Sequence, residues 1–483
     1  MIAFLNDLLW GSVLIYVLIP IGIWFTVGSR VVQFRYFGAM WASLRGAFHH
    51  ESDKATSFQA LALSVAGRVG SGNITGVAVA IALGGPGAIF WMWIVGLLGM
   101  ATSFMECSLA QLYKRLEPSG NFRGGPALYI RHGLGRRLGA FAPVLGGLFA
   151  VLLMVTFPFA FNILQSYALS TSVEAAFGID RLYVGLGLAA LLGAIVFGGL
   201  GRILDTAEFI VPIMAVAYIA LALVVIGMNV TAVPDALSTI VSSAFGLDAA
   251  IGGGIGAAIL QGVRRGLFSN EAGLGSAPNV AALAYVRHPA QQGVVQALSV
   301  FIDTILICTS TALIILLSDI DFANGAVSGV ALTQNALATH VGEWAESFVA
   351  IALGFFVFTS IMYNYVLGEN AIDFFIGEKP RVFRVFQAFT LVLILIGSTL
   401  ARDTAFAFAD VTMGVLALVN LFALILLFPI GRRVLADFDA QRRKGIVPVF
   451  DPDDYADLDI DRSAWVMEGA DADLLATKRA SMG

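Results

Sequence analysis

Charged side chains are scarce in this chain. Only 13% of its 483 residues are Asp, Glu, Lys or Arg, whereas 58% are hydrophobic, and the mean hydropathy is +0.85. This composition excludes a soluble domain and a nucleic-acid-binding protein, and it predicts a polytopic α-helical protein of the lipid bilayer. The net charge of −5 says nothing about a ligand, because residues 434–483 hold eleven acidic and six basic residues and so account for all of it.

Cysteine and histidine are also rare. Cys107 and Cys308 lie far apart in apolar stretches, which favours two small packing residues over a disulfide or a metal pair. All five histidines fall outside the apolar stretches. An intramembrane enzyme would need a nucleophile with a base, or histidine with carboxylates, at membrane depth. We therefore expect no enzymatic activity.

Long apolar runs dominate what remains. Hydropathy predicts eleven membrane spans, the first of which has no basic leader and is too long for the core of a cleaved signal peptide. The spans lie at about 6–27, 59–83, 88–114, 140–170, 183–199, 207–227, 250–284, 291–317, 344–371, 384–400 and 404–430.

Basic residues gather in alternate loops between these spans. They follow the first, third, ninth and last spans, while the loops near 229–249 and 318–343 contain no Lys or Arg. The positive-inside rule then places the N-terminus outside and the C-terminus in the cytoplasm. The basic, aromatic-rich segment 28–58 is expected at the cytoplasmic membrane interface, with an ordinary loop as the alternative. The acidic tail from about residue 434 is expected to be a flexible extension.

The second span is interrupted by Gly67-Arg68-Val69-Gly70-Ser71-Gly72-Asn73. A helix in hydrocarbon satisfies its backbone internally, and irregular backbone survives at that depth only beside protein or a water-filled cavity. Three glycines, a cation and a polar pair have no use in a continuous helix. The sequence therefore predicts a broken helix whose free amides and carbonyls face a small polar ligand.

The seventh span is interrupted in the same way at residues 262–276. With the first span set aside, each break opens a set of five spans, which is typical of inverted-repeat transporters with a binding site at the midplane. Glycine packing faces or the re-entrant loops of a channel are the alternative. Packing alone would not require charges that cost at least about 2.5–3.5 kcal/mol each. The expected divisions are an N-terminal helix with the interfacial segment (1–57), two five-helix repeats (58–228 and 229–433) and the acidic cytoplasmic tail (434–483).

Several motifs carry a family resemblance that extends over nearly all of the chain before the tail. They are GRVGSGNITG at 67–76, GVRRGLFSNEAGLGSAPNV at 262–280, FIDTILICTSTALI at 301–314, YNYVLGENA at 363–371 and ADVTMGVLALVNL at 409–421. With them the chain resembles the alanine or glycine:cation symporter family of the amino acid–polyamine–organocation superfamily. The resemblance implies the leucine-transporter fold, a bacterial inner-membrane location, co-transported sodium and a small neutral amino acid as cargo. Two departures are Ser71, where Thr is frequent, and Phe161, where many relatives have Gly.

An amino acid offers a carboxylate and an ammonium group, which need different partners. The carboxylate suits backbone amides at a half-helix N-terminus, here Ser71, Gly72 and Asn73. The ammonium needs acceptors, here the carbonyls around Phe268, Ser269 and Asn270 in the second break. Family and fold analogy add Gln165 to the substrate site; a polar residue bonded within the bundle is the alternative.

Fold analogy also implies a sodium site. It would combine the carbonyls of Ala66, Val69 and Phe356 with the hydroxyls of Thr359 and Ser360. In the alternative, the two hydroxyls merely bond back to carbonyls of their own helix.

The resulting hypothesis is a sodium-coupled importer of alanine and glycine that works by alternating access as a monomer. A proton-coupled carrier, with Glu271, Glu369 or Asp303 holding the proton, is the close alternative, and an ion channel is a more distant one. The sequence does not pair the remaining intramembrane charges, Arg264 and Arg265 among them.

Overall fold

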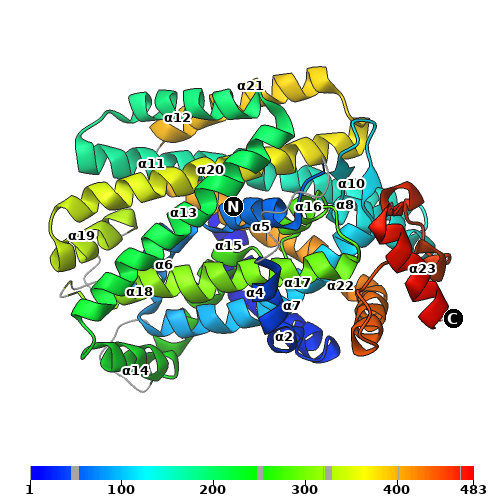
Figure 1. Ribbon diagram of the computed structural model, residues 1–483. Coiled ribbons are helices and arrows are strands. Elements are labelled where there is room, and N and C mark those ends of the chain that lie inside the picture. The colour runs from blue at the N-terminus through cyan, green and yellow to red at the C-terminus, as the bar shows by residue number, and fades with distance from the viewer. Residues whose placement is uncertain are drawn as a thin grey trace.

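Long helices that run roughly side by side make up the computed structural model (Figure 1). It describes residues 2–44, 54–246, 254–318, 320, 329–400, 402–467 and 469–482. Within them, eight helices are long and apolar enough to cross a membrane, and a bent pair makes a ninth span if it is counted as one. Parts of segment 28–58, the start of the seventh expected span and much of the 318–343 loop fall outside the described residues.

The helices coincide closely with the expected spans, and η marks π- or 3₁₀-helical segments. The first half of the chain forms α1 (Ile2–Leu8), η1 (Leu9–Leu14), α2 (Ile15–Gly28), α3 (Val32–Arg35), α4 (Phe37–Ser43), α5 (Ser57–Arg68), η3 (Gly72–Gly76), α6 (Val77–Gly84), α7 (Gly87–Leu112), β1 (Arg115–Leu116), β2 (Phe122–Arg123), α8 (Pro126–Leu128), η4 (Tyr129–Gly133), α9 (Gly135–Leu138), α10 (Phe141–Met154), η5 (Val155–Phe161), α11 (Asn162–Phe177), α12 (Arg181–Val196), α13 (Gly199–Met228) and α14 (Val233–Ala244). The second half forms α15 (Gly254–Asn270), α16 (Ala277–Ala281), α17 (Pro289–Val300), η6 (Phe301–Cys308), α18 (Thr309–Leu316), α19 (Val330–Val341), α20 (Trp344–Ile376), α21 (Pro380–Thr399), α22 (Arg402–Arg443), η7 (Pro452–Tyr455), η8 (Arg462–Trp465) and α23 (Ala470–Met482). Strands β1 and β2 form one short antiparallel hairpin, in which Arg115 pairs with Arg123.

The count of eleven spans stays a prediction. Helix α12 is apolar but has only 16 residues, and the seventh expected span is divided between α15 and α16. Both are shorter than the roughly 20 residues that a straight transmembrane helix needs.

Local sequence explains where the broken second span begins and ends. A capping box starts α5, in which the Thr56 hydroxyl accepts from the Gln59 amide at 3.1 Å and the Gln59 side chain accepts from the Thr56 amide at 3.1 Å. At the other end, α6 stops at Gly85, whose φ of +70° suits glycine, and Pro86 starts the next helix. Both ends of the segment are therefore fixed by ordinary helix signals, and only its middle is unusual.

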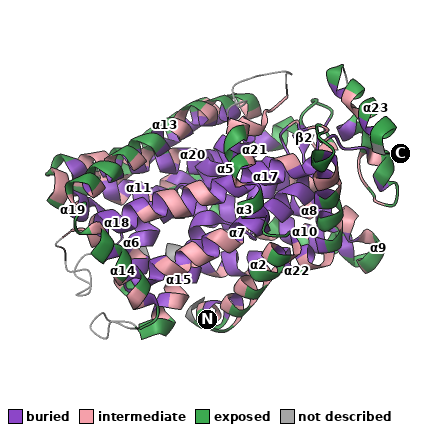
Figure 2. Ribbon diagram, turned by 60° about the horizontal axis from the view of Figure 1, so that its bottom comes forward, coloured by how far each residue is buried: buried purple, intermediate pink, exposed green. Residues whose placement is uncertain are grey.

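Helix α7 lies at the centre of the bundle, where it packs against α15, α17, α2 and α14. Figure 2 shows the buried residues concentrated in this centre and the exposed ones on peripheral helices such as α13. Much of this exposed surface is apolar. On α13 it includes Phe209, Ile213, Val216 and Leu223. A perimeter of this kind is covered by lipid in a membrane protein, which agrees with the class expected from composition.

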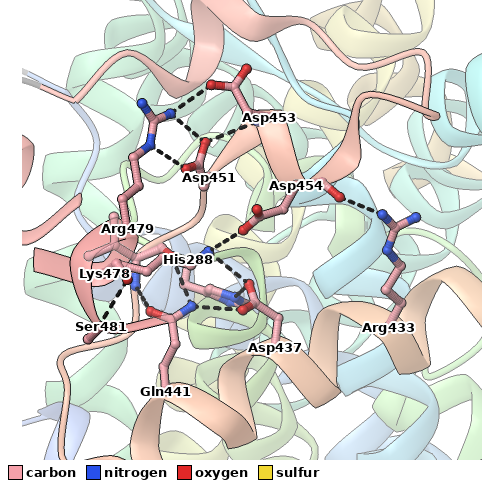
Figure 3. A network of polar contacts seen from close by, with 11 residues as sticks. His288, Arg433, Asp437, Gln441, Asp451, Asp453, Asp454, Lys478, Arg479 and Ser481 are labelled. Carbon is pink, nitrogen blue, oxygen red and sulfur yellow. Dashed lines mark hydrogen bonds and ion pairs between the residues drawn. The ribbon is translucent and has the colours of Figure 1, made fainter. Parts of the chain in front are cut away.

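The acidic tail is folded, contrary to the flexible extension that its composition suggested. Helix α22 continues to Arg443, and the chain then turns back onto the loop before α17. Phe450 and Trp465 are buried there with ring centroids 4.5 Å apart. Figure 3 shows the surrounding polar network, in which Asp451 accepts from Arg479 at 2.6 Å. Composition missed this because a few aromatic anchors and internal ion pairs suffice to hold a short segment on an existing protein surface.

Candidate functional site

The first break separates α5 from η3 and α6, which meet at an angle of 47°. At Val69 the backbone leaves the helical region with φ −82° and ψ +87°. The amides beyond it are not satisfied by the helix. The Gly70 amide donates to Asn73 Oδ1 at 3.0 Å, and the Ser71 amide donates to Gln165 Oε1 at 3.0 Å. The break thus presents backbone donors to side chains, as the sequence predicted.

Glycines in this break are required by close contacts. A Cβ atom on Gly67 would lie 2.3 Å from the ring of Tyr363. On Gly70 it would lie 2.5 Å from Gln165 Nε2 and 2.7 Å from Ser360 Oγ, which are closer than real Cβ contacts. Any larger residue at either position would push neighbouring helices away from the break.

The second break begins where α15 ends at Asn270. Glu271, Gly273 and Gly275 follow with φ of +55°, +91° and +79°, a left-handed path that a glycine-rich segment can take. The Asn270 side chain turns back and accepts from the Ala272 amide at 3.0 Å. Its Nδ2 atom is buried and has no hydrogen-bond partner in the described part of the chain.

The two breaks meet at the centre of the protein. Asn73 Nδ2 lies 3.2 Å from Ser269 Oγ, and a Cβ on Gly72 would touch the Phe268 ring at 3.0 Å. The Phe268 ring lies 5.1 Å from that of Phe161. The structure therefore brings together the residues proposed for the substrate from both breaks. Gln165 does bond within the bundle, as the alternative stated, but its partner is the broken backbone itself.

The atoms expected to bind sodium also converge. Ser360 Oγ donates to the Ala66 carbonyl at 2.8 Å and lies 3.5 Å from the Val69 carbonyl, so it reaches from α20 to the end of α5. Thr359 instead bonds back to its own helix, with Oγ1 3.1 Å from the Phe356 carbonyl, as the alternative anticipated for both hydroxyls. Carbonyl and hydroxyl oxygens form a hard, uncharged donor set that fits a hard cation such as sodium. No group of three His, Cys, Asp or Glu side chains suited to another metal occurs among the described residues.

Asp303 joins the two breaks, a role that the sequence did not reveal. Its carboxylate accepts from Asn73 Nδ2 at 2.6 Å and from Ser269 Oγ at 2.8 Å, and it also accepts from its neighbour Thr304 at 2.7 Å. The only sequence signal was an acidic residue in an apolar run. Its partners on distant segments could not be read from the chain.

Arg68 is also buried between the breaks. It donates to Ser299 Oγ at 2.7 Å and to Ser103 Oγ at 3.0 Å, and within the described residues no carboxylate oxygen lies within 4 Å of it. The other intramembrane charges find partners farther out. Arg264 and Arg265 both pair with Asp410, Arg123 pairs with Glu369 at 2.5 Å, and Glu271 accepts from Ser276 and Tyr363.

Two interrupted helices that meet at a buried polar site define a class, the helical membrane transporters. Comparison with known sequences is more specific. The model of the sodium:alanine symporter family matches residues 1–452, and the chain belongs to that family. Sodium is thus a co-transported ion, and the role is transport rather than catalysis. The resemblance seen in the sequence motifs is confirmed.

Individual relatives agree with this assignment. The chain is 48% identical to a probable sodium/glutamine symporter of Bacillus subtilis, over 92% of this chain and 91% of the relative. It is 44% identical to an amino-acid carrier protein of the same organism, over 92% and 93%. It is 36% identical to a sodium/proton-dependent alanine carrier protein of Bacillus sp. (strain PS3), over 83% and 92%. A crystal structure of the Eremococcus coleocola manganese transporter matches with a TM-score of 0.52 at 13% identity, over 90% and 95%, which shows a similar fold only.

Proposed function

We propose that this protein imports alanine and glycine together with sodium by alternating access. The observation that carries the proposal is the Ser360 hydroxyl, which joins α20 to the Ala66 and Val69 carbonyls freed by the first break. Sodium bound among these oxygens would hold the two helices together. Movement of α5 away from α20 would release it. This couples the ion to the opening of the site.

The amino acid would lie beside the sodium site, between the two breaks. The Ser71 amide, which Gln165 now accepts from, is the proposed donor to the substrate carboxylate. Carbonyls at Phe268 to Asn270 would receive the ammonium group. Phe161 and Phe268 form an aromatic wall on the side-chain direction. A large side chain would displace these rings, and overpacking costs about 1–3 kcal/mol, which is a preference of roughly five- to 150-fold.

Glutamine is a second candidate cargo, because a relative that is 48% identical is named a probable sodium/glutamine symporter. A proton as the coupled cation is a second candidate ion, favoured by the relatives named as sodium/proton-dependent carriers. Asp303 would be its binding residue, since it alone among the acidic side chains bonds to both breaks.

Energy considerations are compatible with one sodium ion per cycle. One positive charge moving down about 100 mV supplies about 2.3 kcal/mol. A tenfold sodium gradient adds about 1.4 kcal/mol. Together they support accumulation of a neutral amino acid by some hundreds-fold.

Uptake of labelled alanine into proteoliposomes, with sodium and pH gradients imposed separately, tests the proposal. We expect uptake driven by sodium, competition by glycine, weak competition by serine and little by leucine or phenylalanine. Labelled glutamine in the same vesicles decides the cargo. Gln165→Ala should raise the alanine half-saturation concentration or abolish uptake, whereas Gly187→Ala, on an open surface of α12, should behave as wild type. Uptake driven only by the pH gradient would refute sodium coupling, and equal competition by alanine and phenylalanine would refute the small pocket.

The wider architecture belongs to the same proposal. It comprises eleven spans, inverted repeats at 58–228 and 229–433, a periplasmic N-terminus, a cytoplasmic C-terminus and a monomeric transporter in a bacterial inner membrane. The acidic segment 434–483 would then lie on the cytoplasmic face.

A further inference from the structure

A cavity of about 240 Å³ lies where the end of α2 meets the last turns of α22, away from the site between the breaks. Its walls include the α2 terminus at Gly28 and three arginines, Arg30, Arg432 and Arg443. All three arginines are exposed. The cavity is therefore open to ligands and rich in guanidinium groups.

The positive charge of this cavity is not neutralised from within. None of the three guanidinium groups makes a hydrogen bond or an ion pair within the described chain, although Arg432 lies over the Phe428 ring at 6.0 Å. Asp439 is the only carboxylate in the lining. Its oxygens already accept from Arg35 Nη1 at 2.5 Å and from the Tyr36 hydroxyl. An anion would thus meet three free guanidinium groups and no free carboxylate.

The surface beside the cavity is apolar and aromatic. Val27, in the last turn of α2, is 68% exposed, and Phe34, just beyond it, is 61% exposed. Trp24 and Trp41 are also exposed on the same stretch of chain. Exposed aromatic side chains with arginines at the end of a membrane span are typical of the boundary between lipid tails and headgroups.

We propose that this cavity binds the headgroup of an anionic phospholipid. Arg30, Arg432 and Arg443 would hold its phosphate oxygens, and the acyl chains would run along the exposed face of α2. Guanidinium groups suit phosphate because they donate in pairs from a fixed plane. Basic pockets between membrane helices on the cytoplasmic side bind anionic headgroups in this way. A free phosphate would use the same arginines but gain nothing from the neighbouring apolar surface.

Native mass spectrometry of the full-length protein, titrated with phosphatidylglycerol or phosphatidylcholine, tests the site. Each basic residue near a membrane surface contributes about 1 kcal/mol to anionic lipid binding, or about fivefold in affinity. Replacing Arg30, Arg432 and Arg443 together with Gln should therefore weaken phosphatidylglycerol binding about 100-fold and leave phosphatidylcholine binding unchanged. The matched control replaces Lys379, Arg381 and Arg384 with Gln, which removes three exposed positive charges elsewhere and should change binding less than twofold.

Two results would overturn the proposal. One is equal phosphatidylglycerol binding by the two triple variants. The other is displacement of the lipid by an equal concentration of inorganic phosphate or glycerol phosphate, which would assign the arginines to a soluble anion. If the triple variant does not elute as a single folded species, Arg443→Gln alone decides the question, with a fivefold loss supporting the site and no loss refuting it.

Discussion

Replacing Ser360 by Ala removes one hydroxyl from the proposed sodium site and nothing else. In the structure this hydroxyl is 2.8 Å from the Ala66 carbonyl and 3.5 Å from the Val69 carbonyl, so it belongs to both helices that the ion would join. The variant should still bind the amino acid, because Ser360 makes no hydrogen bond to either break's substrate residues. We therefore expect a change in sodium dependence before any change in cargo preference.

The size of the effect follows from the lost contact. A hydrogen bond to a charged group contributes about 1.5–3 kcal/mol, which we take as the scale for one sodium–oxygen contact and which corresponds to about 10- to 150-fold in affinity. Part of the loss is offset, because sodium no longer has to displace the Ser360 hydroxyl from the Ala66 carbonyl. We therefore expect the lower end, about a tenfold rise in the sodium concentration for half-maximal uptake.

Labelled alanine uptake into proteoliposomes, measured from low to high sodium with choline as the replacement ion, checks this. Ser310→Ala is the matched control, because its hydroxyl donates to the Leu306 carbonyl of its own helix at 2.8 Å. Thr359→Val should have a smaller effect than Ser360→Ala, since the Thr359 hydroxyl also bonds to its own helix. An unchanged sodium dependence in Ser360→Ala would refute the assigned ion site.

Three further predictions concern the break, the topology and the tail. Gly70→Ala should reduce the rate of alanine uptake by roughly five- to 150-fold, because its Cβ would lie 2.7 Å or less from two neighbouring side chains, while Gly187→Ala should not. In a background without native cysteines, cysteine at Ala232 should react with an impermeant maleimide from outside and cysteine at Ala470 should not. Burial lowers the pKa of His288, which the tail covers, so undocking binds a proton and is favoured as pH falls below 6.5; tail amides should exchange faster with deuterium at pH 5.5 than at pH 7.5, after correction for intrinsic rates.

The parts of the fold that the sequence predicts are those with a local signal. The break at 67–73 is visible because three glycines and Arg68 interrupt an apolar run, and the structure shows a bend there. The second break is visible for the same reason, and its glycines do take positive φ. Hydropathy found the long helices because lipid selects each of them for apolar side chains independently of its neighbours.

Pairings between distant segments leave no such signal. The sequence shows that Asp303 and Asp410 are buried acids, but not that one bonds to both breaks and the other to two arginines. The tail is the opposite case. Its composition argues for disorder when judged alone, yet Phe450 and Trp465 pack on a surface made by the rest of the protein. In both cases the deciding partner lies far away in the sequence.

One physical constraint connects the fold to the proposed transport cycle. An unsatisfied buried polar group costs about 1–3 kcal/mol, so a helix cannot be broken in a membrane unless side chains satisfy the freed groups. Here Asn73 accepts from the Gly70 amide, Gln165 accepts from the Ser71 amide, and Ser360 donates to the Ala66 carbonyl. Binding of an amino acid or an ion is therefore an exchange of partners, in which each ligand displaces a side chain that was already bonded. The affinity is the difference between two comparable terms, and a modest affinity of this kind is what a carrier needs, since it must release its cargo as readily as it takes it up.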